Sequence, residues 1–586
     1  MARLDPHSCN DAAQPEVTHL DWKARVDFAA RVIEAEATLE LLSAGQGPLD
    51  LDTRELTVHG VFGEDGAKLA YSLAPAEPVL GSRLRIELPA GTRRVRIAYR
   101  TSPQASALQW LTPAQTAGGK QPFLFSQCQS IHARSVVPLQ DTPRVRIRFR
   151  AEVRVPKALR VVMAAGFVRR EEQGDEAVET FEMPQAIPPY LLALAAGELV
   201  SRDVGPRSRV WAEPSVVEKA AWEFGGVDAM LLAAEKLFGP YEWDRFDVLT
   251  MPPSFPYGGM ENPRLTFLTP TLLAGDRSLV NVLAHELAHS WTGNLVTNAN
   301  ANHFWLNEGF TVWAERRIQE ALSGADVAGL HAALGRRGLE KAIAGFKDHP
   351  EWTRLRTDFA GVDPDEAYSE VPYEKGFLFL RAIEEVVGRP AFDAFLRKYL
   401  DAFRFRSITT EDFTALVDKE LPGVLAKVNA QEWIDGPGVP ANAPLARSAR
   451  LEALQALGTN LPADEVAKRW TPTEWSLYLE SLPHPSSREA CAELDRRFSL
   501  GKSGNYEVLV SWLSLAASSG FEPAVPRVEE VLGKVGRMKY LKPLYTALAT
   551  NSATRENARR CFEKHKDSYH PIAQQVIAGI LKKNGA

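Results

Sequence analysis

Hydrophobic and polar residues alternate with a period of two through the first third of the chain. Residues 18–200 contain segments such as ELTVHGVF, RLRIELP, RRVRIAYR and RVRIRFRAEVRVP, separated by Gly and Pro. Side chains that alternate in this way line the two opposite faces of a strand. The pattern therefore predicts a first domain over residues 1–200 that is mainly β-sheet.

The apolar spacing changes to three and four residues in residues 216–435, as in SVVEKAAWEFGGVDAMLLAAEKLFG and KGFLFLRAIEEVVG. This spacing is typical of amphipathic helices and predicts a second domain over residues 201–434. DGPGVPANAPLA, residues 435–446, is rich in Pro and Gly and predicts a linker. Helical segments such as YEVLVSWLSLAASSG then predict a stacked α-helical domain over residues 447–586, although no repeat of fixed period is visible.

Length and charge narrow the class of protein. A chain of 586 residues is too long for one hydrophobic core, which favours several domains. Hydrophobic residues make up 45% and charged residues 24%, as in ordinary globular proteins. Because 68 basic residues face 74 acidic ones, the net charge of −6 gives no basic surface for nucleic acid or anionic membrane. We expect neither as a partner.

The cysteines and the first residues bear on the cellular compartment. Cys9, Cys128, Cys491 and Cys561 are scattered and form no CxxC pair, which favours a reducing environment. The start, MARLDPHSCNDAAQPEV, lacks the apolar core of a signal peptide, and no run of about 18 apolar residues occurs. We therefore expect a soluble, cytoplasmic protein.

The stretch HELAHSW, residues 285–291, predicts a metal site. His285 and His289 are four residues apart, so on a helix both imidazoles lie on one face and converge on one ion. Glu286 is turned partly away and is placed to take a proton from water without binding the metal. HExxH also arises by chance on helix surfaces. The surrounding residues therefore have to show whether this one is a zinc site.

A third ligand is available in NEGF, where Glu308 follows His289 by 19 residues. Two imidazoles and one carboxylate leave the fourth position of a zinc ion for water, which is the catalytic arrangement. NEGF at this distance favours zinc over a coincidental helix surface. Glu315, seven residues later, either accepts a hydrogen bond from a ligand histidine or pairs with Arg316 or Arg317 on an exposed helix face.

The segment PPSFPYGGMENPRLTF precedes the predicted zinc helix. Paired glycines let a bound peptide approach the backbone closely, and the carboxylate of Glu261 could hold a substrate ammonium by a charge-assisted hydrogen bond. Taken alone, GGMEN is a turn with a capping Glu. Its place before HELAH favours recognition of a peptide amino terminus.

The motifs GGMEN, HELAH and NEG, in this order, resemble the gluzincin aminopeptidases. Longer strings are similar to the leukotriene A4 hydrolase family over residues 106–543: SALQWLTPAQT, FLFSQCQSIHARSVVPLQDTP, HSWTGNLVTN, VPYEKGF and GRMKYLKPL. The resemblance implies a multidomain α+β fold, with an N-terminal β saddle domain, a thermolysin-like zinc catalytic domain and a C-terminal α-helical superhelix. It also implies one zinc ion per chain, held by His285, His289 and Glu308.

The same resemblance implies how a peptide would bind. Gln129 in QCQ and Glu261 in GGMEN would bind the free α-amine. Gly258, Gly259 and Met260 would line the peptide backbone.

Residues in the second half of the chain would complete the site. Tyr373 in VPYEKG would donate a hydrogen bond to the oxyanion, with Tyr368 nearby, and Asp365 would serve epoxide hydrolysis and recognition of the first side chain. Arg537 and Lys539 in GRMK would receive a substrate carboxylate. Without the resemblance, Tyr373 would be a packed aromatic residue, Asp365 a turn residue and GRMK a solvated helix end.

These observations favour a zinc aminopeptidase that acts on short peptides, with Glu286 as general base and then acid. The alternative is an epoxide hydrolase acting on a fatty-acid epoxide, alone or beside the peptidase activity. A binding scaffold that keeps only the fold would not need the three ligands and Glu286. An endopeptidase would not need Glu261.

Overall fold

The alternating segments of the first third form two β-sheets. In this computed structural model, which describes residues 4–586, the larger sheet has eight strands in the order β10-β11-β8-β1-β2-β5-β3, with β4 paired to β5. In β1 and β8 buried residues alternate with more exposed ones, as the sequence pattern predicts, whereas β4 and β10 have no buried residue. Their bounds are β1 Val17–Asp27, β2 Val32–Thr53, β3 Thr57–Phe62, β4 Tyr71–Leu73, β5 Ser82–Arg100, β8 Ile147–Pro156, β10 Gly166–Gln173 and β11 Glu176–Ile187.

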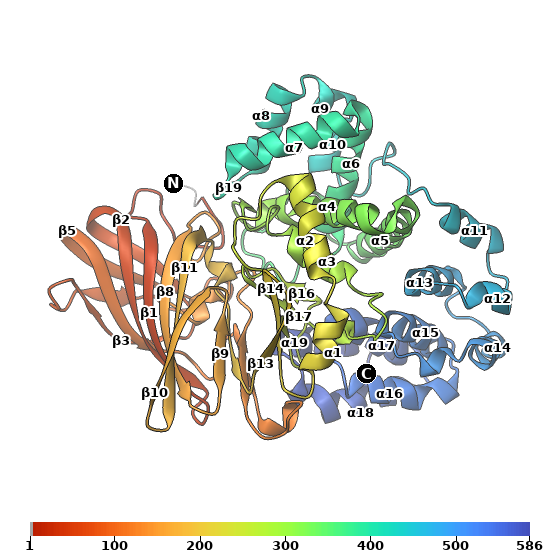
Figure 1. Cartoon of the computed structure of the whole chain (residues 1–586), viewed down its shortest axis with the longest axis horizontal. Coiled ribbons are helices and arrows are strands. Elements are labelled where there is room, and N and C mark those ends of the chain that lie inside the picture. Colours follow the sequence, from red (N-terminus) through yellow and green to blue (C-terminus); the bar gives the residue numbers. More distant parts are fainter. Residues whose placement is uncertain (1–3) are drawn as a thin grey trace.

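The smaller sheet of this domain has the order β6-β7-β12-β9. Its strands are β6 Leu108–Leu111, β7 Phe123–Ser126, β9 Arg160–Met163 and β12 Leu194–Gly197, and β7 and β12 are buried along their whole length. Gln129 follows β7 by three residues, so this sheet positions the one predicted site residue that comes from the N-terminal domain. Figure 1 shows the domain in red and orange at one end of the molecule.

The second domain begins with a five-stranded sheet in the order β13-β14-β15-β17-β16. Its strands are β13 Val200–Gly205, β14 Ser208–Ala212, β15 Asp247–Thr250, β16 Gly259–Met260 and β17 Leu265–Leu268; β18 Val296–Asn298 pairs with β19 Arg406–Ile408 elsewhere. The apolar pattern of residues 216–435 predicts helices and does not predict the strands β15 to β19. These strands have only two to four residues, and β17 and β18 are buried at every position, so no alternation marks them.

The domain also contains ten α-helices. They are α1 Val217–Glu223, α2 Val227–Phe238, α3 Asn281–Ala288, α4 Trp305–Ser323, α5 Ala325–Gly345, α6 Gly376–Val387, α7 Arg389–Phe403, α8 Thr410–Glu420, α9 Val424–Lys427 and α10 Ala430–Asp435. Helices α1, α2 and α3 pack against the five-stranded sheet, and α3 and α4 carry His285, Glu286 and Glu308. Every residue of α4 from Trp305 to Gln319 is buried, because α2, α3, α5, α6 and β18 all pack against it. Such a helix has no solvent face.

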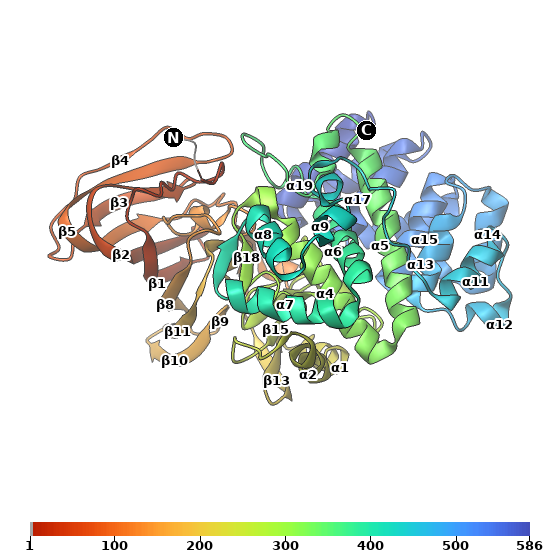
Figure 2. The same ribbon diagram turned by 90° about the horizontal axis from the view of Figure 1, so that it is seen from above.

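The remaining helices form the C-terminal domain, drawn in blue in Figures 1 and 2. They are α11 Ala449–Leu457, α12 Asp464–Ala467, α13 Pro472–Ser481, α14 Arg488–Phe498, α15 Tyr506–Ser518, α16 Val525–Leu532, α17 Met538–Thr550, α18 Arg555–His565 and α19 Pro571–Lys583. No helix or strand occupies residues 436–448, where the sequence predicts the linker. The domain boundaries placed at residues 200, 434 and 446 stay predictions.

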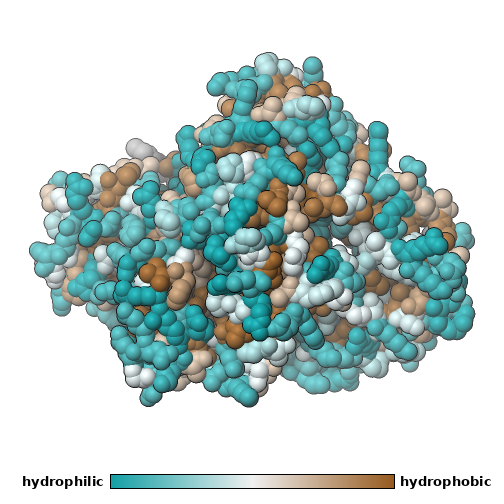
Figure 3. Space-filling view, in the orientation of Figure 1, coloured by the Kyte–Doolittle hydropathy of each residue, from teal (hydrophilic) through white to brown (hydrophobic). Residues whose placement is uncertain are grey.

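The hydrophobic cores divide the molecule into two parts. One continuous core runs from Val17 to Ile434 through both the N-terminal and the second domain. The C-terminal helices have a second core, to which α5 contributes Leu330 and Ala333. Figure 3 shows a largely hydrophilic face on which apolar residues form small groups. Among residues 4–586, no helix is long and apolar enough to cross a membrane.

We predict that Gly309→Ala destabilises the protein. Helices α4 and α6 cross where a Cβ on Gly309 would lie 2.7 Å from the Cα of Gly376, so a methyl group there must push two buried helices apart. Overpacking of this kind costs about 1–3 kcal/mol. The expected result is a lower apparent melting temperature in a thermal unfolding experiment.

The matched control is Gly579→Ala in α19, where no atom lies within 4 Å of the added Cβ. This change should leave the melting temperature unchanged or raise it, since alanine favours the helix by up to about 1 kcal/mol. Equal melting temperatures for the Gly309→Ala variant and the unchanged protein would contradict the close helix crossing.

Candidate active site

Three side-chain donor atoms converge between α3 and α4. The Nε2 atoms of His285 and His289 are 3.2 Å apart, and Oε2 of Glu308 lies 3.4 Å from each of them. Ligands at about 2.0–2.1 Å from a tetrahedral zinc ion are about 3.3 Å from one another. The spacing of the three predicted ligands therefore fits one zinc ion.

The electrostatics of this group also fit a cation. Oε2 of Glu308 is buried and has no hydrogen-bond donor among the described residues, which is unfavourable for a carboxylate unless a positive charge compensates it. Burial opposes protonation of His285 and His289, but Glu308 and the other carboxylates around them together outweigh burial and raise the pKa of both imidazoles. Since Glu261 and Glu286 add two further buried carboxylates, the site carries an excess of negative charge.

The outer nitrogen of each histidine has a partner that fixes its orientation. Nδ1 of His285 lies 3.1 Å from Oε2 of Glu315, and Nδ1 of His289 lies 3.2 Å from the carbonyl oxygen of Thr292. Because both partners can only accept, each Nδ1 carries the proton and each Nε2 offers its lone pair to the metal position. Of the two alternatives for Glu315, the structure has the contact with a histidine.

Glu286 lies beside Gly259 in strand β16. A Cβ on Gly259 would stand 2.2 Å from Oε1 of Glu286, so only glycine leaves room for this carboxylate. Burial raises the pKa of the Glu286 carboxyl to about 7. A dication at the neighbouring donors would lower it again, toward the ionised form that accepts a proton.

Strand β16 offers an edge to an extended peptide. It pairs antiparallel with β17 and is the last strand of its sheet in the part of the chain that the structure describes. An unpaired edge of this kind binds a peptide through main-chain hydrogen bonds. Gly258 continues the edge, and a Cβ there would lie 2.6 Å from Nη2 of Arg537. The side chain of Met260 points away, with its sulfur 3.1 Å from Nε2 of Gln127.

Glu261 and Gln129 meet at one end of this strand. Nε2 of Gln129 donates to Oε1 of Glu261 over 3.2 Å, and Nδ2 of Asn294 donates to the backbone carbonyl of Glu261 over 2.7 Å. Burial raises the pKa of Glu261, whose residue surface is only 4% exposed. A buried carboxylate with a neutral amide as its side-chain partner is a suitable acceptor for an ammonium group.

Tyr373 and Tyr368 lie together on the other side of the metal donors. Their hydroxyl oxygens are 3.0 Å apart, and the ring of Tyr373 stacks on His285 with 6.1 Å between centroids. Oδ2 of Asp365 lies 2.8 Å from Nε2 of His132. Sequence reasoning missed His132, which comes from the N-terminal domain and carries no local signal.

The two predicted basic residues of the C-terminal domain, Arg537 and Lys539, differ in burial and in their contacts. Arg537 is buried and donates to the hydroxyl of Tyr540 over 2.9 Å, whereas the side chain of Lys539 is half-exposed and pairs with Glu507 at 2.8 Å. Glu507 was also missed, since nothing in YEVLV distinguishes it from a solvated helical glutamate. Arg537 faces Gly258, and its contact with the same carboxylate, Glu507, is longer at 3.6 Å.

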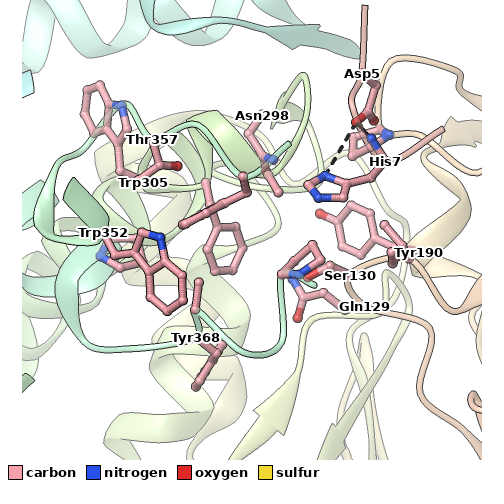
Figure 4. Close-up of a pocket in the computed structure, with 18 of the residues that line it drawn as sticks. Asp5, His7, Gln129, Ser130, Tyr190, Asn298, Trp305, Trp352, Thr357 and Tyr368 are labelled. Carbon is pink, nitrogen blue, oxygen red and sulfur yellow. Dashed lines mark hydrogen bonds and ion pairs between the residues drawn. The ribbon is translucent and has the colours of Figure 1, made fainter. Parts of the chain in front are cut away.

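All predicted site residues except Met260 line one cavity of about 350 Å³. The cavity lies where the three domains meet, and its volume is in the range of sites for small molecules and short peptides. A smaller apolar cavity of about 60 Å³ adjoins it at Gln129 and Tyr368. Figure 4 shows Trp305 and Trp352 on one side of this second cavity and His7 and Tyr190 on the other. Metal donors beside a carboxylate base and an open strand edge define the class of metal-dependent peptidases.

Comparison with known proteins agrees with this class. The sequence matches the Peptidase M1 N-terminal domain over residues 17–191, the Peptidase family M1 domain over residues 222–433 and the domain described as Leukotriene A4 hydrolase, C-terminal, over residues 470–581. The chain belongs to peptidase family M1. This confirms the resemblance seen in the motifs and the three-part α/β architecture that it implies.

Individual relatives cover the whole chain. Leukotriene A-4 hydrolase of Xenopus laevis is 37% identical over 98% of this chain and 99% of its own length. Leucine aminopeptidase 2 of Yarrowia lipolytica is 37% identical over 99% of this chain and 93% of its own. The structure of yeast LTA4 hydrolase in complex with bestatin superposes with a TM-score of 0.92 at 35% identity, covering 99% of this chain and 97% of the other.

We predict that Gly259→Ala removes most activity without unfolding the protein. The new methyl group would occupy the place of the Glu286 carboxylate and force it away from the metal donors. Since general acid–base groups contribute about 10²–10⁴-fold, kcat should fall at least about 10²-fold. The measurement is steady-state hydrolysis of an aminoacyl amide, together with the zinc content of the variant.

Gly345→Ala is the control, because no atom lies within 4 Å of its added Cβ at the end of α5. That variant should keep kcat within about twofold, as isolated surface changes do. A Gly259→Ala enzyme with unchanged kcat would mean that Glu286 does not act from this position.

Proposed function

We propose that the chain is a zinc-dependent aminopeptidase that removes N-terminal residues from short peptides. The observation that carries this proposal is the arrangement of charges in one cavity. A buried carboxylate, Glu261, stands at one end of strand β16, a buried cation, Arg537, faces Gly258 at the other, and the metal donors lie beside the strand. A di- or tripeptide has the opposite charges at its two ends.

His285, His289 and Glu308 would hold one zinc ion per chain, because their three free donor atoms have the spacing that zinc requires. Bound there, zinc supplies Lewis acidity, which polarises a carbonyl group and lowers the pKa of water. Glu315 holds His285 in the tautomer that can bind a metal.

Glu286 is the proton carrier of the reaction. It takes a proton from the attacking water and returns it to the nitrogen of the leaving amine, which makes it first a base and then an acid. Burial against Gly259 keeps this carboxylate beside the carbon that is attacked.

Tyr373 donates a hydrogen bond to the oxyanion that develops as the carbonyl carbon becomes tetrahedral. A phenol fixed in a site away from bulk water stabilises this charge more in the transition state than in the substrate. Tyr368 helps to orient it through the 3.0 Å contact between the two hydroxyl groups.

Substrate length follows from the two ends of the cavity. Glu261 and Gln129 hold the free α-amine, the β16 edge pairs with the peptide backbone, and Arg537 holds the C-terminal carboxylate. Fixing both ends places the first peptide bond at the metal donors and converts binding energy into orientation. Longer peptides would lack the carboxylate contact at this distance.

The first test is cleavage of aminoacyl chromogenic amides and tripeptides, each free and N-acetylated. We expect zinc-dependent release from free amino termini only, with loss of activity after chelation and in Glu286→Gln. Glu261→Gln should lower kcat/KM about 10–100-fold, the loss expected for a hydrogen bond to a charged group.

Two results would contradict the proposal. Equal cleavage of acetylated and free substrates, unchanged in Glu261→Ala, would indicate an endopeptidase. Absence of cleavage by enzyme with one zinc per chain would leave the lipid hydrolase or a binding scaffold as the explanation.

A second candidate activity is hydrolysis of a fatty-acid epoxide. Relatives named leukotriene A-4 hydrolase favour it, as do Asp365 and Arg537 in one cavity, where they could direct water and hold a carboxylate. The adjoining apolar cavity of about 60 Å³ is smaller than the roughly 300 Å³ at which sites for drug-sized ligands begin. Its size suits one amino-acid side chain better than a long acyl chain.

Asp365→Asn separates the two activities. The carboxamide keeps the shape of the carboxylate but cannot take a proton from water, so epoxide hydrolysis should be abolished while peptide cleavage stays within about tenfold. Product analysis with an unsaturated fatty-acid epoxide, beside a tripeptide assay, gives the comparison. Parallel loss of both activities would mean that Asp365 serves the peptide reaction as well.

We further propose a cytoplasmic location. Cys128, Cys491 and Cys561 are buried free thiols, which suits a reducing compartment.

A further inference from the structure

A buried ion pair connects the metal-binding helix to the segment that carries Tyr373. Nη2 of Arg316 on α4 donates to Oε1 and Oε2 of Glu374 over 2.7 and 3.0 Å, and both side chains are only 9% exposed. Glu374 is the next residue after Tyr373. Arg316 follows Glu315 on the helix that also carries Glu308.

The segment around Tyr373 is a single π-helical turn, Val371–Lys375, that leads into α6. Such turns have wider hydrogen-bond spacing than an α-helix and occur often at functional sites. Regular helix geometry therefore does not by itself fix the direction of Tyr373, and contacts from neighbouring elements have to do so.

Two residues of the turn make those contacts. Glu374 binds Arg316, and the ammonium group of Lys375 donates to the carbonyl oxygens of Thr353 and Gly436 over 2.9 and 2.7 Å. Glu374 is also enclosed by α5, since a Cβ on Gly335 would lie 2.1 Å from its Oε1. The carboxylate is therefore held between α5 and the guanidinium.

An ion pair so deeply buried is not explained by stability alone. Desolvation of both groups offsets most of the Coulomb attraction, and apolar residues of the same size often serve stability as well. What this ion pair adds is direction, because both carboxylate oxygens of Glu374 accept from Nη2 of Arg316, whose Nε and Nη1 have no hydrogen-bond partner among the described residues.

We propose that Arg316 and Glu374 are positioning residues for catalysis: the pair holds the Tyr373 hydroxyl at a fixed place relative to the metal ligands on α4. The inference rests on the oxyanion role proposed above for Tyr373. It adds that this role depends on a contact between two residues that need not touch the reacting atoms.

The test is a double-mutant cycle on kcat and KM. Arg316→Lys and Glu374→Asp keep both charges, and hence the fold, but change the geometry of the pair. Each should lower kcat about 10–100-fold with KM changed less than about twofold, because a misplaced catalytic group can cost about 10²-fold. Zinc content should stay at the level of the unchanged enzyme.

The cycle is closed in the Tyr373→Phe background. If the pair acts through the hydroxyl, the same changes should lower kcat less than about twofold further once that hydroxyl is gone. A readout besides turnover is the affinity of a phosphonate dipeptide analogue, measured by calorimetry. Its tetrahedral anion should bind about tenfold more weakly to either pair variant, whereas a planar peptide product should bind as before.

The adjacent residue provides a matched control. Arg317, also 9% exposed and on the same helix, forms a two-bond pair with Asp393 of α7 instead of Glu374. Arg317→Lys should therefore leave kcat and phosphonate affinity within about twofold of the unchanged enzyme.

The outcomes separate the two proposals. If Tyr373→Phe leaves kcat unchanged, the oxyanion role itself fails. If Tyr373→Phe lowers kcat but the pair variants lower it by the same factor with and without the hydroxyl, only the positioning role fails. A rise in KM without a fall in kcat would instead make Arg316 or Glu374 a substrate contact and would also overturn the inference.

Discussion

Burial of helix α4 from Trp305 to Gln319 is the constraint on which the site depends. A helix without a solvent face must find a partner for each charge that it carries, since an unpaired buried charge costs several kcal/mol. The partners come from different elements: Glu308 faces the histidines of α3, Glu315 accepts from one of them, Arg316 binds the turn before α6, and Arg317 binds α7. Satisfying these four charges therefore places the surrounding elements and builds the metal site at the same time.

The substrate cavity adds a second requirement, which is that the three domains keep fixed positions relative to one another. The backbone N–H groups of Gly536 and Met538 donate to the carbonyl oxygens of Pro253 and Pro256 over 2.7 and 2.8 Å. These bonds fix Arg537, the residue between them, against the loop that leads to β16. Because Gln129 arrives from the N-terminal sheets, recognition of a peptide uses side chains from all three domains.

The sequence predicted what depends on local spacing and missed what depends on distant contacts. The two histidines of HELAH lie on one helical face as their spacing requires, and the alternating strands of the first third form sheets. Strands β15 to β19 were not predicted, because hydrophobic and polar residues do not alternate in such short, mostly buried strands. The pairing of His132 with Asp365 joins residues 233 positions apart, and that of Arg316 with Glu374 joins residues 58 positions apart, so no window of sequence contains either.

The division of the apolar interior into two cores has a consequence for how the molecule unfolds. Residues that share one core lose their packing together, whereas separate cores can open independently. The first two domains should then behave as one cooperative unit in amide hydrogen exchange, and helices α11 to α19 as another. Since Arg537 belongs to the second unit and the metal donors to the first, opening of the second alone would release the carboxylate end of a bound peptide and leave the metal donors in place.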